Sequence, residues 1–217
     1  MRMALEKVRD APRSTKERIL ATAEQVFAAR GFAGASTREI ASQAGVNISS
    51  LHYHWESKET LYRAVFEGIY QRILELARST IPEDLGDRRI DRTAVEHSME
   101  VLFDFFADNP DVAKLLLRRY IENEAEPADI ESEVLVPAWK IFDGWIEERG
   151  GKSVAGLDVP LFMLTMYIVS MSLVLDSRQA TMLIDGRIDD AATRDRVRRF
   201  VTGLAPTLLG MRARRST

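Results

Sequence analysis

The 217-residue sequence contains no cysteine. This absence excludes disulfide bonds, thiolate metal ligands and a cysteine nucleophile. Histidine is scarce, with three residues in all, and no second histidine lies at metal-ligand spacing from His97. A glycine-rich phosphate loop and a serine, histidine and acid pattern with local support are missing too. The sequence therefore predicts a protein with no catalytic residues, no metal and no cofactor, and an all-helical enzyme is the disfavoured alternative.

Long hydrophobic runs are also missing. The longest apolar stretch, Leu161 to Leu175, is bounded by Asp158 and Asp176 and is shorter than the roughly 20 residues that a membrane-spanning helix needs. The start of the chain, Met1 to Glu6, lacks the apolar core of a signal peptide. We therefore expect a cytoplasmic protein with no membrane partner, in which the apolar stretch forms a buried helix.

Helical periodicity is present along most of the chain, and no alternation of apolar and polar residues indicates a strand. Besides two short helices near residues 40 and 50, we expect helices over residues 14–31, 57–79, 91–107, 110–123, 130–149, 159–182 and 190–209. Pro137 should kink the helix that contains it, and Pro206 should end or bend the last one. The predicted fold class is all-α.

The segment from Ser36 to Trp55 is the most informative part of the sequence. Ser36 and Glu39 have the spacing of a capping box, which starts a helix. Gly45 lies where a helix ends by entering a left-handed conformation, and Asn47 is a favourable N-cap for the next segment. The segment therefore predicts a helix, a glycine turn and a second short helix.

This second short helix should have a polar outer side. Ile48, Leu51 and Trp55 recur at helical spacing and should face inward. The opposite side carries short hydrogen-bonding and aromatic groups suited to the major groove of DNA; they are Ser49, Ser50 and Tyr53, with His52 and His54 on the flanks. Spacing alone is equally compatible with an ordinary packing of two helices.

The net charge of −3 is unevenly distributed. Residues 1–60 carry nine Lys and Arg against seven Asp and Glu, whereas the rest of the chain carries 21 against 26. This mild asymmetry is compatible with a small basic N-terminal part on an acidic remainder, but it does not by itself indicate that the protein binds nucleic acid. Four basic residues near the start could add phosphate contacts or simply be solvated; they are Arg9, Arg13, Lys16 and Arg18.

The stretch from Ser14 to Phe66 resembles the N-terminal domain of the tetracycline-repressor (TetR) family of bacterial transcription regulators. The matching elements are Ile19-Leu20-x-x-Ala23-x-x-Val26-Phe27, Gly31-Phe32, Thr37-x-x-x-Ile40-Ala41, Ala44-Gly45-Val46, Leu51-x-Tyr53-His54-Trp55 and Lys58-x-x-Leu61. These matches lie in register and span about a quarter of the chain.

The resemblance implies a helix-turn-helix DNA-binding domain over residues 12–60 and a helical ligand-binding and dimerisation domain over residues 61–212. It assigns DNA-backbone contacts to Thr37 and Arg38, recognition-helix positions to Ser49, Ser50, His52 and Tyr53, and phosphate contacts to His54 and Lys58. Asn47, the expected N-cap, joins this DNA-binding set. His52 stands where the family often has tyrosine, so no operator sequence can be transferred.

In that family the last two long helices commonly pair with a partner chain, and the middle helices enclose a small-molecule pocket. The resemblance thus implies a homodimer with an apolar seam at Leu161, Leu164, Ile168, Met171, Leu175, Val197, Val201, Leu204 and Leu208. The candidate pocket residues, mostly apolar with a few polar anchors, are His97, Phe105, Tyr120, Trp139, Phe142, Met163, Met166, Tyr167 and Ser170. Ordinary core packing is the alternative for every residue in both sets.

We therefore expect a ligand-responsive transcriptional repressor that binds double-stranded, palindromic operator DNA as a homodimer and is released by a small, largely apolar effector. Its two recognition helices would lie about 34–36 Å apart, the separation of successive major grooves on one face of DNA. The helix over residues 57–79 would couple head and body. The alternative is a helix-turn-helix DNA-binding protein whose body is an architectural or protein-interaction platform without an inducer.

Overall fold

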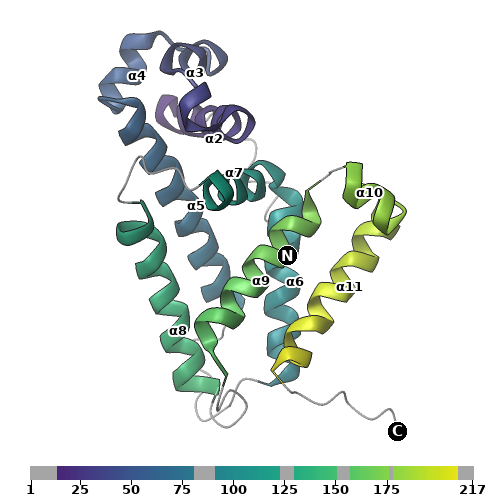
Figure 1. The fold of residues 1–217 in the computed structure, drawn as a ribbon. Helices are drawn as coiled ribbons and strands as arrows, with labels where there is room; N and C mark the ends of the chain where they lie inside the picture. Colours follow the sequence, from purple (N-terminus) through teal and green to yellow (C-terminus); the bar gives the residue numbers. More distant parts are fainter. Residues whose placement is uncertain (1–13, 81–90, 123–129, 151–156, 176–177, 210–217) are drawn as a thin grey trace, which may run out of the picture. The chain divides into compact units, whose positions relative to one another are not determined.

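The computed structural model describes residues 14–80, 91–122, 130–150, 157–175 and 178–209. In chain order they form α2 (Thr15–Gly34), α3 (Thr37–Gln43), α4 (Ile48–His54), α5 (Lys58–Thr80), α6 (Arg92–Asp108), α7 (Pro110–Glu122), the π-helix η2 (Glu131–Leu135), α8 (Val136–Gly150), α9 (Val159–Val174), α10 (Arg178–Ile184) and α11 (Ala191–Leu208) (Figure 1). These residues include no strand, and the predicted all-α fold class is confirmed.

The chain divides into two compact units, Met1–Val65 and Phe66–Thr217, which we call the head and the body. Helix α5 begins in the head and ends in the body, since the division falls within it. The boundary expected after residue 60 lies in the same helix. Each unit has its own buried core.

The head is held together by an aromatic cluster under its helices. The Tyr62 ring lies edge-on to the rings of Phe27 and Phe32, with centroids 4.8 Å and 5.0 Å away. Around this cluster, fully buried aliphatic side chains come from α2, α3, α4 and α5; they are Ile19, Ile40, Leu51 and Leu61. Because each such side chain contributes roughly 1.5–3 kcal/mol when buried, this core fixes the positions of the short helices α3 and α4.

Side-chain caps start the helices of the head. Ser14 and Glu17 form a complete capping box at α2, with the Ser14 N–H donating to Glu17 Oε2 at 2.8 Å and the Glu17 N–H to Ser14 Oγ at 3.2 Å. At α3 the Ser36 hydroxyl accepts from the Glu39 N–H, but the Glu39 carboxylate pairs with Arg30 at 2.8 Å. The capping box predicted at Ser36 is therefore only half present.

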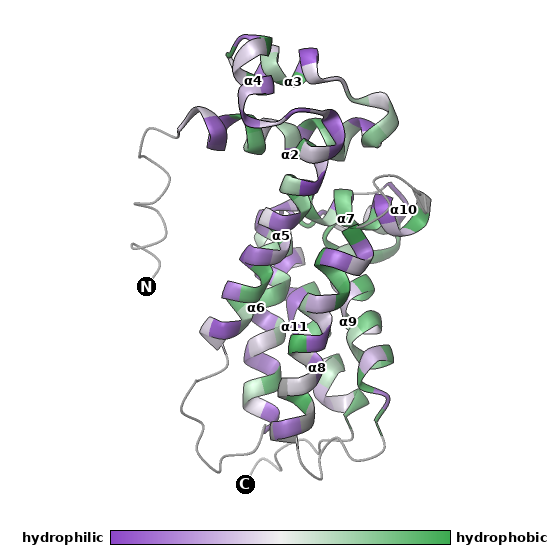
Figure 2. Ribbon diagram, turned by 90° about the vertical axis from the view of Figure 1, so that its left-hand side faces the viewer, coloured by the Kyte–Doolittle hydropathy of each residue, from purple (hydrophilic) through white to green (hydrophobic). Residues whose placement is uncertain are grey.

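The body is a helical bundle in which α6 packs against both α9 and α11, while α7 and α8 also pack against α9. Helix α9 is hydrophobic along nearly its whole length (Figure 2), as a helix covered on several sides should be. Its Met166 and Met171 are buried, together with Phe103 and Phe106 of α6. The prediction of a buried helix in this stretch is thus confirmed for the side of α9 that faces its neighbours.

An ion-pair network joins α11 to α6. The Arg194 guanidinium lies 2.9 Å from an Asp104 oxygen and 2.7 Å from an Asp108 oxygen. Arg198 also contacts Asp104, at 3.3 Å, and Glu100 at the same distance. Each pair is partly exposed and therefore contributes little alone, roughly 0–1 kcal/mol, but together they fix the register of α11 along α6.

The single helix predicted over residues 159–182 is wrong. Helix α9 ends at Val174, Leu175 has an extended backbone with ψ 126°, and α10 begins at Arg178. The two helices are bent by 92° relative to each other. Within the described ranges, no single helix is both long and apolar enough to cross a membrane, and only this bent pair reaches that length and composition.

Pro137 is preceded by a π-helical turn. The Val136 N–H donates to the Glu131 carbonyl, five residues earlier, and α8 then continues through Pro137. A proline inside a helix supplies no N–H to the carbonyl four residues before it, and a π turn is one way in which a helix absorbs such a defect. The predicted irregularity therefore takes the form of a wider turn.

Candidate nucleic-acid interface and ligand pocket

The head presents a helix-turn-helix made by α3 and α4. Gly45 connects them with φ 66°, a conformation that residues with a side chain rarely adopt. The Val46 N–H closes the turn by donating to the Ala41 carbonyl at 3.0 Å. The Asn47 side-chain oxygen then accepts from the Ser50 N–H at 2.6 Å and starts α4.

Helix α4 turns its apolar side into the head and its polar side outward. Leu51 is fully buried and Trp55 nearly so, whereas Tyr53 is 84% exposed. Ser49 and His52 are exposed on the same outer side, and Ser50 and His54 are half-buried at its edges. Hydroxyl, imidazole and phenol groups are thus accessible to a large partner.

A shallow groove with polar residues along it runs beside this face. It is lined by Thr15, Asn47, Ser49, Ser50, Tyr53 and His54. Five of these six residues belong to the predicted DNA-binding set, and Thr15 is an addition. Its position could have been recognised because Thr15 follows the N-cap of α2, where unpaired backbone N–H groups suit a phosphate.

The remaining candidates lie outside the groove. Thr37 and Arg38 form the first turn of α3, where Thr37 is half-buried and Arg38 exposed. Arg18 donates to the Gly45 carbonyl at 3.5 Å, and Lys16 is exposed. Arg9 and Arg13, two of the basic residues considered for phosphate contacts, lie outside the described residues.

Lys58 is engaged inside the head. Its ammonium donates to the carbonyl oxygens of Phe32 and Ala35 at 2.9 Å and 3.3 Å, and it lies 4.3 Å from the centroid of the Phe32 ring. These contacts join the start of α5 to the carboxyl end of α2. The structure therefore gives Lys58 a structural role in the head, and the phosphate contact that the resemblance implied stays a prediction.

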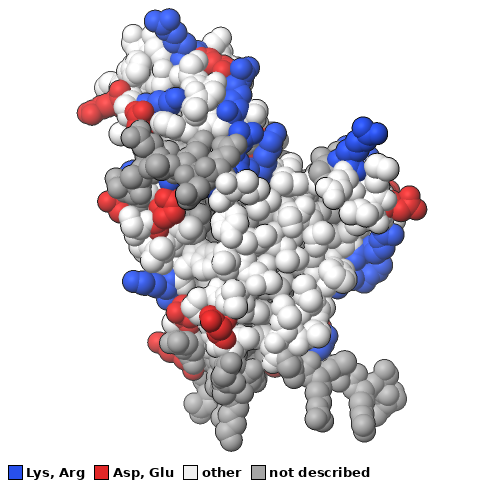
Figure 3. All heavy atoms as spheres, viewed as in Figure 1, with Lys and Arg blue, Asp and Glu red and all other residues white. Residues whose placement is uncertain are grey.

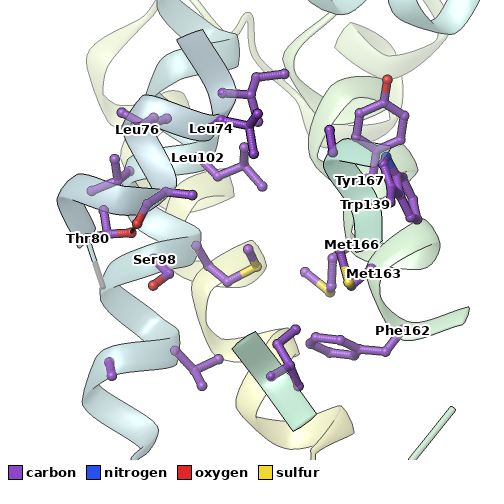
Figure 4. A pocket seen from close by; sticks show the side chains of 18 of the residues that line it. Leu74, Leu76, Thr80, Ser98, Leu102, Trp139, Phe162, Met163, Met166 and Tyr167 are labelled. Atoms are coloured by element: carbon purple, nitrogen blue, oxygen red, sulfur yellow. Dashed lines mark hydrogen bonds between the residues drawn. The ribbon is translucent and has the colours of Figure 1, made fainter. Parts of the chain in front are cut away.

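The body contains a cavity of about 230 Å³ between α5, α6, α8 and α9, and its lining is almost wholly apolar. Figure 4 shows Trp139 and Tyr167 together on one wall, with Met163 and Met166 below them and Leu74 and Leu102 opposite. Trp139, Met163, Met166 and Tyr167 are four of the nine candidate pocket residues.

The other candidates are placed elsewhere. His97 is exposed on α6, Tyr120 is 55% exposed on α7, and Phe105 and the fully buried Ser170 are not among the lining residues. The side chain of Phe142 lies outside the described residues. The wall from α5 and α6, which includes Tyr70, Leu74 and Leu102, is an addition. Because leucines at helical spacing look the same in a core and in a cavity wall, the sequence carries no signal for it.

Two tyrosines close one end of this cavity with a hydrogen bond between their hydroxyl groups. Burial raises the pKa of Tyr70 to about 12 and the pKa of Tyr167 well above its ordinary value. Both side chains are therefore neutral phenols at physiological pH. The Tyr167 ring also contacts Trp139 edge-on, with centroids 5.5 Å apart.

An ion pair lies behind the tyrosines. Arg119 of α7 is 5% exposed and binds both carboxylate oxygens of Glu131, at 2.5 Å and 2.7 Å. Burial favours a higher pKa for Glu131, but the hydrogen bonds from Arg119, a backbone hydrogen bond and the charge of Arg119 together outweigh burial and hold the pKa below its ordinary value. The guanidinium also lies 5.5 Å from the centroid of the Phe66 ring on α5. The pair therefore links α7, η2 and α5.

The predicted seam residues fall into two groups. Met171, Val197 and Val201 are buried within the chain. The outward side of α9 and α11 carries the others, with Leu161 59% and Leu208 47% exposed and Leu164, Ile168, Leu175 and Leu204 half-buried. Phe200, at 64% exposure, and Met182 and Leu183 of α10, above 70%, are exposed apolar residues that the seam prediction missed. Two arginines directly precede Phe200 in the sequence and hid it from a search for apolar periodicity.

No group of three or more His, Asp and Glu side chains among the described residues is placed to hold a metal ion. The features with a clear chemical purpose are thus the outward face of the helix-turn-helix and the apolar cavity. Together they describe an all-helical DNA-binding protein with a separate body.

Comparison with known proteins identifies the family. Residues 19–65 match the model of "Bacterial regulatory proteins, tetR family". The chain is 30% identical over 155 residues to the helix-turn-helix transcriptional regulator YttP of Bacillus subtilis, across 68% of this chain and 70% of the relative. It is 33% identical over 93 residues to the transcriptional repressor KstR2 of Mycolicibacterium smegmatis, across 40% of this chain and 45% of the relative.

The fold agrees with these relatives. A transcriptional regulator from Streptomyces coelicolor has a similar structure, with a TM-score of 0.64 and 23% identity across 90% of this chain and 98% of the other. The chain belongs to the TetR family of bacterial transcriptional regulators, and its head is the family's helix-turn-helix DNA-binding domain.

Proposed function

We propose that this regulator is a homodimeric, non-enzymatic repressor that acts in the cytoplasm, binds palindromic operator DNA and is released by a small, largely apolar effector. The observation that carries the proposal is the combination of an outward polar face on α4 with an apolar cavity in the other unit. The similarity of part of this chain to the repressor KstR2 supports repression, as opposed to activation, of transcription.

The outer face of α4 offers the chemistry for reading DNA. The hydroxyls of Ser49 and Tyr53 and the imidazole of His52 can donate to or accept from base edges in the major groove. The exposed guanidinium of Arg38 at the start of α3 supplies a charge for the phosphate backbone. Base contacts would thus come from α4 and backbone contacts from the amino ends of α2 and α3.

A second copy of the chain is the partner proposed for the outer side of α9 and α11. Figure 3 shows very few charged side chains where α9 runs across the body in Figure 1. Large apolar side chains are exposed on these two helices, among them Leu161, Phe200 and Leu208, and exposed apolar surface of this kind favours an interaction site. Twofold pairing would also supply the two recognition helices that a palindrome requires.

Helix α5 is the proposed connection between the two functions. Leu61 and Tyr62 are buried in the head, and further along the same helix Tyr70 and Leu74 line the cavity. A ligand that favours one placement of α5 would change how far apart the two heads of a dimer lie. A tenfold loss of operator affinity needs only about 1.4 kcal/mol of differential ligand binding.

Footprinting on double-stranded DNA that flanks the chain's own gene tests this function. We expect two protected half-sites with centres one helical turn or a multiple of it apart, about 10–10.5 base pairs per turn. A matched fragment with one half-site scrambled is the control and should lose most of the binding. Protection of a single, non-repeated site would contradict the dimeric reading, and no binding to any duplex at modest salt would contradict DNA recognition.

Thermal-shift screening separates the repressor from an architectural protein. A compound that binds the native body raises its melting temperature and should lower operator affinity in the same concentration range. A compound that raises the melting temperature and leaves DNA binding unchanged would contradict the proposed coupling through α5.

A further inference from the structure

The cavity of the body contains no charged side chain. Among the described residues that line it there is no Asp, Glu, Lys, Arg or His. Its polar groups are uncharged, and one of them, the Thr80 hydroxyl, already donates to the Ala77 carbonyl of its own helix at 2.9 Å. A charged group placed inside would lose its hydration without gaining a counter-ion, which makes its burial unfavourable by several kcal/mol.

Arg119, the cation beside the tyrosine end of the cavity, is already neutralised. Glu131 holds its guanidinium through two hydrogen bonds at 2.5 Å and 2.7 Å. An anionic ligand would have to displace this carboxylate and would leave Glu131 without its partner. The ion pair therefore disfavours an acid in the cavity, although a cation stands close to Tyr70.

The tyrosine pair has one hydroxyl hydrogen that is not used in the hydrogen bond between the two residues. Tyr70 and Tyr167 carry one hydroxyl hydrogen each, and their mutual hydrogen bond uses one of the two. Because Tyr70 is only 6% exposed, the remaining hydrogen has little access to bulk water. An alcohol, ketone or ester oxygen in the cavity is an acceptor of the required kind.

The volume limits the size of the occupant. An apolar cavity of about 150 Å³ is known to take up benzene, so by proportion a cavity of about 230 Å³ accommodates about nine or ten non-hydrogen atoms. The polarisable side chains of Met163 and Met166 and the ring of Trp139 can adapt to an aliphatic or an aromatic body.

We propose that the cavity binds an uncharged, mainly apolar molecule of about ten non-hydrogen atoms with one hydrogen-bond acceptor that meets the Tyr70–Tyr167 pair. This inference rests on the proposed function for its biological meaning, but binding itself is measured without DNA. It excludes carboxylic acids and amines in their ionised forms as occupants.

Three probes of equal size, each with about ten non-hydrogen atoms, test the proposal by calorimetry on the full chain. They are 1-nonanol, nonylammonium and octanoate. We expect the alcohol to bind about 100-fold or more tightly than either ion, since an unpaired charge is strongly disfavoured in this lining. Octanoate or nonylammonium binding as tightly as nonanol would overturn the inference, and so would the absence of nonanol binding.

Two variants locate the bound alcohol. Ser98→Phe places a ring in the cavity and should abolish nonanol binding, whereas His97→Phe, next to it on the exposed side of α6, should leave binding unchanged. The double substitution Tyr70→Phe/Tyr167→Phe removes both hydroxyls, and with them the spare donor, and should weaken nonanol about fivefold, the usual value of one neutral hydrogen bond. Unchanged binding in Ser98→Phe would place the alcohol elsewhere, and unchanged binding in the double variant would overturn the contact with the tyrosine pair.

Operator release distinguishes this inference from the proposed function. If nonanol binds in the cavity and operator affinity does not change, the ligand class stands and the ligand-responsive function fails. If octanoate binds in the cavity and releases DNA, the function stands and the assignment of an uncharged ligand fails.

Discussion

Replacing Lys58 by methionine separates a structural role from a role in DNA binding. The substitution keeps an unbranched side chain of similar length and removes the ammonium, which makes two hydrogen bonds to carbonyl oxygens and one contact with the Phe32 ring. A hydrogen bond from a charged donor contributes roughly 1.5–3 kcal/mol and an exposed cation–π contact about 0.5–1 kcal/mol. Because Lys58 is half-buried and its second hydrogen bond is long, we expect a loss of about 2 kcal/mol in the head.

Amide hydrogen exchange on the intact chain measures this loss in the head separately from the body. Exchange of the buried amides around Leu51 and Trp55 should become about 30-fold faster, the factor that corresponds to 2 kcal/mol. Lys16→Met, at an exposed position of α2, is the control and should leave exchange unchanged.

Salt dependence of operator affinity provides the second measurement for Lys58. Each phosphate neutralised by a side chain adds about 0.9 to the slope of log affinity against log salt. We expect the slope to be the same in Lys58→Met and in the unaltered chain. Unchanged exchange together with a slope reduced by about 0.9 would refute the structural role of Lys58 and support its contact with a phosphate.

Four further outcomes are expected. Tyr53→Ala should weaken operator binding about tenfold or more in an anisotropy titration and leave the sedimentation of the dimer unchanged; loss of both would mean that the ring belongs to the core. Phe200→Glu should shift the dimer towards monomer in sedimentation, and an unchanged dimer would place the interface elsewhere. Because the pKa of Tyr70 is raised from 10.0 to about 12, its stabilising effect is complete below pH 10 and is lost as the pH rises towards 12. Alkaline unfolding followed by phenolate absorbance should show this loss, and Tyr70→Phe should reduce it, since the contribution of Tyr167 remains. The contribution of Glu131 to stability changes with pH in the opposite direction. Because its pKa is lowered from 4.5, the contribution is present above that pH and lost in acid. Acid unfolding of Glu131→Gln, compared with the unaltered chain, measures it.

Local backbone chemistry made the head predictable. Gly45, Asn47 and the Ser14 cap act on residues next to them in the chain, so their effect can be read without knowing the tertiary structure. The apolar side of α4 was predictable for a similar reason, because Leu51 and Trp55 can face only the core of the head. The half-formed cap at Ser36 was less predictable, since the competing partner of Glu39 is Arg30, on another helix.

Which apolar residues are buried within the chain and which face outward depends on tertiary contacts, which the sequence does not show. Apolar periodicity finds a stripe on α9 and α11, but Met171 and Val201 belong to the chain's own core while Leu161 faces outward. The break after Val174 was missed because the polar residues that follow it, from Asp176 to Gln179, are also compatible with the outer side of a helix. The contacts of Lys58 with the Phe32 and Ala35 carbonyls were not predictable, because a lysine in a sequence does not show which carbonyl oxygens will lie within its reach.

Asp104 is shared by two arginines one helical turn apart on α11, at 2.9 Å from Arg194 and 3.3 Å from Arg198. A neutral residue at this position would leave two guanidinium groups close together with one fewer anion between them, so the change would weaken the contact between α6 and α11 although Asp108 and Glu100 remain. Relatives that lack the acid should therefore also lack one of the two arginines. Three positions on two helices are thereby expected to diverge together, and this covariation can be looked for as sequences of the family accumulate.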